Sequence, residues 1–170
     1  ILTFAEVAEE YDLPLLCIGT EFRKAVTQRP EFWIDLIEEV KKVYKGKLTY
    51  AANWDNYKNV VFWDKLDYIG VDAYFPLSEE STPTGLELNN SWQPLKSDLS
   101  DFANKWNKQI IFSEFGYQSR DYATDGHWKH DKATVQTNMT SQANAYKAIF
   151  QSVWGEEWFA GGFLWKWHSN

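Results

Sequence analysis

The sequence predicts an α/β fold in which helices cover a parallel sheet. Five short apolar segments have the composition of buried strands, and helical segments alternate with them along the chain. Strands that form continuous apolar runs and alternate with helices are typical of parallel sheets covered on both faces. The 170 residues fit one domain of ordinary size, so two complete domains are not expected.

The first part of the chain predicts helix, strand, helix and strand. Residues 1–11 have a helical pattern, and the apolar run 15–20 between Pro14 and Glu21 is predicted as a buried strand. Apolar residues recur at helical spacing over 30–44, with Pro30 in the first turn and Gly46 beyond the end, which predicts a second helix. Residues 48–53 form the next predicted strand, and 55–65 a short helical or irregular connection.

The rest of the chain repeats this alternation. Residues 68–74 are predicted as a strand that ends before Pro76, and a polar loop containing Pro83, Gly85 and Pro94 precedes a predicted helix over 95–106. A strand over 109–113, a long loop over 115–137, a helix over 139–154 and a strand over 160–165 follow. Because no glycine-rich phosphate-binding motif follows any strand, a (β/α)8 barrel is the expected architecture.

Charge and composition restrict the partners. A formal net charge of −7 and a pI of about 5.0 provide no basic footprint for nucleic acid or an anionic membrane, so a neutral or weakly cationic partner is expected. No apolar run reaches the roughly 18 residues needed for a membrane span. Aromatic residues make up 18% of the chain and many neighbour polar residues, which predicts an aromatic-lined cleft. The single cysteine, Cys17, is predicted to be a buried thiol without a disulfide partner.

Residues whose side chains can take part in catalysis or sugar binding follow the predicted strands, at the end where barrel enzymes carry their active sites. They are Glu21, Asn53, Trp54, Asp72, Tyr74, Glu114, Trp165 and Trp167. Side-chain alternation predicts that Cys17, Gly19 and Glu21 share one face of their strand, as do Phe112 and Glu114. Two carboxylates at a barrel mouth suit glycosidic cleavage, in which one group protonates the leaving oxygen and the other attacks the anomeric carbon.

Five segments at the predicted strand ends carry a family resemblance. They are LCIGTE at 16–21, YAANW at 50–54, DYIGVDAYFP at 67–76, FSEFGY at 112–117 and GGFLW at 161–165. In this order and spacing they resemble Glycoside Hydrolase Family 113, which belongs to the clan of (β/α)8 retaining glycosidases and is known for β-mannanases. The resemblance covers essentially all of residues 1–170 and implies strands four to eight of one catalytic barrel, with strands one to three missing.

The resemblance also implies roles for individual residues. Glu21 matches the acid/base and Glu114 the nucleophile, which in a retaining enzyme lie about 5–5.5 Å apart. Tyr74 is expected to hydrogen-bond Glu114, and Trp165 to form the floor of the subsite at the scissile bond. The substrate-binding residues implied are Asn53, Trp54, Asp72, Tyr74, Trp165 and Trp167. No metal or organic cofactor is expected.

Two positions depart from the wider clan. Thr20 replaces the asparagine that precedes the acid/base in most relatives, and Asp72 replaces the histidine that several carry. The leading hypothesis is a β-mannanase acting on a polysaccharide or oligosaccharide. Two alternatives are the same mechanism on β-glucan or xylan, and a catalytically inactive carbohydrate-binding barrel. In each case five strands leave two unpaired edges, so the missing barrel half is expected in cis or from another chain.

Overall fold

The computed structural model describes residues 1–126, 129 and 135–166. Within them, five parallel strands form one sheet in the order β1-β2-β3-β4-β5. The strands are β1 (Leu15–Thr20), β2 (Lys47–Asn53), β3 (Ile69–Asp72), β4 (Ile110–Phe115) and β5 (Phe159–Leu164). The predicted α/β class is confirmed, and all five predicted strands are present. β1 and β5 form the two edges of this sheet, as expected for part of a barrel.

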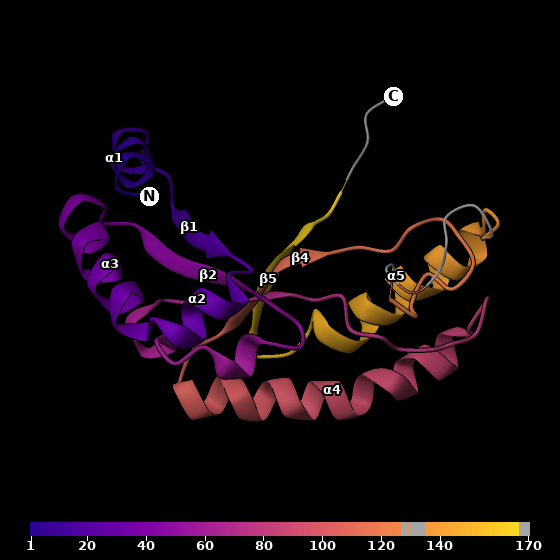
Figure 1. Cartoon of the computed structure of the whole chain (residues 1–170). Helices are drawn as coiled ribbons and strands as arrows, with labels where there is room; N and C mark the ends of the chain where they lie inside the picture. The colour runs from indigo at the N-terminus through magenta and orange to yellow at the C-terminus, as the bar shows by residue number, and fades with distance from the viewer. Residues whose placement is uncertain (127–128, 130–134, 167–170) are drawn as a thin grey trace.

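Helices lie along one side of the curved sheet. The helices are α1 (Leu2–Glu10), α2 (Arg23–Gln28), α3 (Pro30–Val43), α4 (Gly85–Trp106) and α5 (Met139–Val153), with two 3-10 turns at Tyr57–Asn59 and Trp63–Lys65. Figure 1 shows α3, α4 and α5 beneath the sheet, with its opposite side open between α1 and the end of β5. The short helix α2 was not predicted. None of the described helices is both long and apolar enough to cross a membrane.

Helix α4 begins ten residues earlier than the predicted helix at 95–106. Thr84 caps it: the Thr84 Oγ1 accepts from the Glu87 backbone N–H at 3.2 Å, and the Glu87 carboxylate accepts from the Thr84 N–H at 2.7 Å. Pro94 lies inside the helix and removes one backbone donor. Burial of Leu88 and Trp92 before the proline offsets this loss, so the prediction of a loop there was wrong.

We expect Thr84→Ala to lower the free energy of unfolding by about 1 kcal/mol, as for other lost N-caps. Two hydrogen bonds from Thr84 keep the pKa of Glu87 below its usual value. The stabilisation by ionised Glu87 is therefore complete above the pKa of an ordinary glutamate. It is lost as the pH falls through the lower pKa that Glu87 has in the folded protein. Urea unfolding at pH 7 measures the difference. Ser97→Ala, on the exposed face of the same helix, is the control, and an equal loss in both variants would contradict the capping argument.

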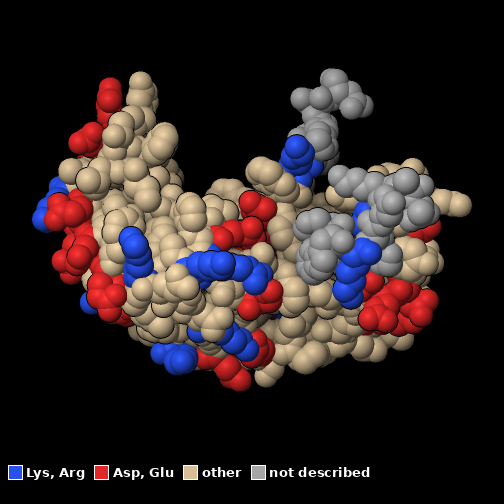
Figure 2. Space-filling view, in the orientation of Figure 1, with Lys and Arg blue, Asp and Glu red and all other residues tan. Residues whose placement is uncertain are grey.

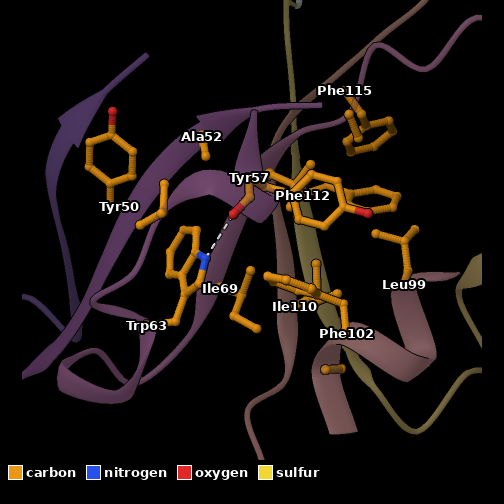
Figure 3. Close-up of a cluster of buried hydrophobic side chains, with 14 of the residues drawn as sticks. Tyr50, Ala52, Tyr57, Trp63, Ile69, Leu99, Phe102, Ile110, Phe112 and Phe115 are labelled. Carbon is orange, nitrogen blue, oxygen red and sulfur yellow. Dashed lines mark hydrogen bonds between the residues drawn. The ribbon is translucent and has the colours of Figure 1, made fainter. Parts of the chain in front are cut away.

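Aromatic side chains fill the layer between sheet and helices. The Trp92 ring of α4 stacks on Phe112 of β4 at 6.3 Å and 23°, and Trp33 of α3 stacks on Phe62 at 5.8 Å and 17°. Figure 3 shows part of this layer, including the hydrogen bond of 3.0 Å from the Trp63 Nε1–H to the Tyr57 carbonyl. Much of the aromatic content therefore forms the core, and only part of it lines the predicted cleft.

The face alternation predicted for β1 fails at an irregularity in its pairing. The register with β2 shifts between Cys17 and Thr20. A Cβ on Gly19 would lie 2.8 Å from the Trp33 ring, so Gly19 faces the helices, whereas Cys17 faces the open side. Cys17 is exposed and does not form the buried thiol that was predicted. The apolar run around it fits an inner strand face that no described residue covers.

Candidate active site

The carboxyl ends of the strands form one open cleft of about 1040 Å³. Five of the predicted site residues line it: Glu21, Asn53, Tyr74, Glu114 and Trp165. They come from the ends of β1, β2, β3, β4 and β5, which a parallel sheet brings to the same edge. Figure 2 shows Asp and Glu side chains in the hollowed middle of this face. Residues distant in sequence are thus assembled by sheet topology.

Glu114 is positioned by a β-bulge and by a tyrosine. The register of β4 against β3 shifts so that Val71 pairs with Phe112 but Asp72 pairs with Glu114. Phe112 is buried on the helix side, so the predicted sharing of one face with Glu114 was wrong, and the bulge supplies the physical reason. The Tyr74 hydroxyl donates to Glu114 Oε2 at 2.8 Å, which confirms the predicted contact.

Tyr74 remains a hydrogen-bond donor over the whole physiological range. Burial, the hydrogen bond to Glu114 and the surrounding carboxylates raise the pKa of its hydroxyl far above that of a free tyrosine. A neutral hydroxyl beside a carboxylate favours the ionised carboxylate, because the donated hydrogen bond is stronger to the charged form. Glu114 thus has a neutral hydrogen-bond donor in Tyr74.

Glu21 occupies the opposite environment. It follows β1 with a left-handed backbone conformation (φ 55°), and its N–H donates to the Ala51 carbonyl at 2.9 Å. Partial desolvation, and after it the charge of Glu114, raise the pKa of Glu21, while Arg23 lowers it. The two carboxyl groups therefore interact electrostatically, and the charge of Glu114 favours the protonated form of Glu21.

Asp72 lies at the floor of the site. It is fully buried (0% exposed), and its Oδ1 accepts from the Ser113 Oγ at 2.8 Å. Burial raises its pKa to about 7; Glu114 and Glu21 contribute in the same direction, and the Ser113 hydrogen bond opposes them. Asp72 was expected to bind substrate. It lines a cavity of about 230 Å³ together with Glu114, and its binding of substrate stays a prediction.

The remaining predicted residues lie at different places. The exposed Trp165 ring (57%) stands at the cleft beyond β5, with its backbone N–H donating to the Phe115 carbonyl at 2.8 Å. Asn53 lines the cleft, and no described residue hydrogen-bonds its buried Oδ1. Trp54 packs against Phe75 at 6.1 Å and is not among the described residues that line the cleft. Trp167 lies outside the described residues.

The sequence profile of Glycoside Hydrolase Family 113 matches residues 1–170. The chain belongs to this family. No curated protein sequence matches the Family 113 chain. Solved structures are similar to this chain. One is a complex of a GH113 β-1,4-mannanase, which is 26% identical in sequence and has a TM-score of 0.81. The match covers 98% of this chain and 49% of that chain.

Other solved structures support the same fold. The GH113 β-mannanase AaManA from Alicyclobacillus acidocaldarius, in complex with ManMIm, is 28% identical with a TM-score of 0.79, over 98% of this chain and 49% of that one. A Faecalibacterium prausnitzii β-glucuronidase is 16% identical with a TM-score of 0.70, over 96% of this chain and 27% of that one, and is similar in fold alone. The Family 113 chain thus spans about half the length of its mannanase neighbours and matches a partial barrel.

Sequence reasoning missed the far side of the cleft. Gln118 and Arg120 line it from the long loop after β4, and Gln142 and Tyr146 line it from α5. Arg120 is buried, and the Gln142 side chain donates to the Tyr117 carbonyl at 2.8 Å. The available signal was only their location in or after a long loop at the carboxyl end of the sheet. Among the described residues, no group of three or more His, Cys, Asp or Glu side chains could hold a metal ion.

Proposed function

We propose that this protein is a retaining glycoside hydrolase that cleaves β-1,4-linked mannan-type polysaccharide by double displacement. One observation carries the proposal: two glutamates share a cleft in opposite environments, with the pKa of Glu21 raised and Glu114 accepting the Tyr74 hydrogen bond. Separation of the protonation states of two carboxyl groups is what assigns an acid and a nucleophile. The family match and the mannanase neighbours support the same reaction class.

Each glutamate acts twice in this mechanism. Glu21 protonates the glycosidic oxygen while Glu114 attacks the anomeric carbon, so the C–O bond to the leaving group breaks and a covalent glycosyl–Glu114 ester forms. Glu21, now ionised, removes a proton from water, which attacks the same carbon. The ester breaks, Glu114 leaves as a carboxylate, and the product retains its anomeric configuration.

The substrate class rests on the neighbours and on the cleft. The solved Family 113 structures are described as β-mannanases, and the exposed Trp165 ring offers an apolar face on which a sugar ring can stack. Strands β1 and β5 form the edges of the described sheet, where an eight-stranded barrel has none. We therefore also propose that the remaining strands, in cis or from another chain, complete the working barrel.

The test begins with the intact mass of the purified protein, which establishes whether the assayed material carries more than the 19.9 kDa of this sequence. Material with a complete barrel is then incubated with mannan, β-glucan and xylan, and the anomeric configuration of the first product is followed by proton NMR. Preferential release of β-configured manno-oligosaccharides is expected. Faster cleavage of glucan or xylan would contradict the substrate class, and binding of polysaccharide without turnover would contradict the enzymatic function.

Tyr74→Phe should lower kcat about 10- to 100-fold, because a hydrogen bond to a charged group contributes about 1.5–3 kcal/mol. The loss should affect kcat and kcat/KM together, since the Tyr74 hydroxyl donates to Glu114, the group that attacks in the transition state. Steady-state kinetics on manno-oligosaccharides measures it. Tyr68→Phe, before the start of β3 and outside the cleft lining, is the matched control. Equal activity of the two variants would remove Tyr74 from the mechanism.

A further inference from the structure

Ser113 is an extra residue in β4. Its neighbours Phe112 and Glu114 pair with the consecutive residues Val71 and Asp72 of β3, so Ser113 has no counterpart. Phe112 and Phe115 are both buried against aromatic residues on the helix side, whereas Ser113 and Glu114 both line a cavity of about 230 Å³ on the open side. Two successive side chains on one face define a β-bulge, a feature that redirects side chains next to active sites.

The bulge is fastened to β3 at Asp72. The Ser113 Oγ donates to Asp72 Oδ1 at 2.8 Å, and the Ala73 N–H donates to the Glu114 carbonyl at 2.7 Å. The backbone carbonyl of Asp72 also accepts from the Trp54 and Tyr74 N–H groups, at 3.1 and 3.0 Å. Asp72 is thus a fixed point on the central strand, and the Ser113 hydroxyl links its side chain to the bulge.

We propose that Asp72, acting through Ser113, is the positioning residue for Glu114: the pair holds the β4 bulge in the conformation that directs the Glu114 carboxylate into the cleft. The catalytic consequence rests on the proposed function. The geometric claim does not, because it concerns only the Asp72–Ser113 contact and the bulge. A displaced Glu114 would miss the anomeric carbon, and misplacement of a reacting group by about 1 Å can cost about 100-fold in rate.

The charge state of Asp72 gives this role a pH signature. The titratable groups that face it are Cys17 of β1, Glu21 after β1, Tyr50 of β2, Tyr74 after β3 and Glu114 of β4. With its pKa raised to about 7, Asp72 is neutral under mildly acidic conditions and becomes negatively charged above neutrality. Because the folded pKa is higher than the unfolded one, its contribution to stability is largest at low pH and is lost as the pH rises through about 7.

The kinetic test uses four variants of the complete protein. At pH 6, Ser113→Ala should lower kcat about 10- to 100-fold with little change in KM, and Ser113→Thr should restore most of the activity by returning the hydroxyl. Asp72→Asn should lose less activity than Ser113→Ala, because the amide oxygen can still accept from the Ser113 hydroxyl. Ser152→Ala, which removes a buried hydroxyl bonded to Asn89 between α5 and α4, is the control. Equal losses in Ser113→Ala and Ser113→Thr, or a loss in Asp72→Asn as large as that in Ser113→Ala, would overturn the proposal.

The second test needs no turnover, so its failure is separate from failure of the proposed function. Side-chain carboxyl groups of Asp and Glu are labelled with ¹³C and titrated by NMR, with Asp72→Asn identifying the Asp72 resonance. Asp72 should titrate near pH 7, and higher in Ser113→Ala, because loss of a hydrogen bond to the charged form raises the pKa. The Ser152→Ala protein should leave it unmoved. Titration of Asp72 in the ordinary aspartate range, or no response to Ser113→Ala, would refute the contact.

Discussion

Replacement of Glu114 by Gln should abolish mannan hydrolysis while leaving the fold intact. The amide keeps the size of the side chain and can still accept from the Tyr74 hydroxyl, which at present donates to Glu114 at 2.8 Å. It cannot form the glycosyl ester, because an amide oxygen is a poor nucleophile. We expect kcat to fall by roughly 10⁴-fold or more, as when catalytic nucleophiles are removed elsewhere. Initial rates on manno-oligosaccharides and a thermal unfolding curve measure the two halves of this prediction.

The matched control is Glu38→Gln, an exposed glutamate of α3 that lies outside the cleft lining. A chemical test adds discrimination. In Glu114→Ala, azide can occupy the vacated space and attack an activated β-mannoside in one displacement, which gives the α-azide. In Glu21→Ala it would attack the glycosyl–Glu114 ester and give the β-azide. Substantial turnover by Glu114→Gln, or a β-azide from Glu114→Ala, would assign the nucleophile elsewhere.

Replacement of Glu21 by Gln should give a loss that depends on the leaving group. General acid catalysis contributes about 10²–10⁴-fold, and that loss should be complete for mannan, whose departing sugar needs a proton. An aryl mannoside with an acidic phenol leaves without assistance, so its first step should be nearly normal. Slow breakdown of the ester should then limit turnover, and a burst of phenol released in the first turnover should precede a slow steady state. Stopped-flow absorbance measures the burst.

The same variant has a pH signature. The raised pKa of Glu21 keeps it protonated to higher pH than an ordinary glutamate, so activity should be lost on the alkaline side as this proton dissociates. Glu21→Gln should remove that dependence, whereas Glu38→Gln should leave it in place. Equal losses on mannan and on the aryl mannoside would show that Glu21 is not the acid.

The strand ends were predictable because they follow a local rule. Apolar runs that stop at Glu21, Asn53 and Glu114 mark where buried strands reach solvent, and parallel topology then places those positions at one edge. The Tyr74–Glu114 contact was implied by the family resemblance, and the structure contains it. The local rule failed for the start of α4. Pro83, Gly85 and Pro94 each indicate a loop when taken singly. The Thr84 cap and the burial of Trp92 nevertheless stabilise a helix there.

The sequence by itself determined the α/β class, the order of the strands along the chain and the two glutamates, since each depends on residue type and spacing. Only the tertiary structure decided which way individual side chains face. Gly19 and Phe112 face the helices because irregular pairing in β1 and β4 shifts the alternation. The burial of Asp72 beside Glu114 likewise arises from its place on the central strand. The face on which a side chain lies depends on the register between neighbouring strands. Register belongs to a pair of strands, so the sequence of one strand does not determine it.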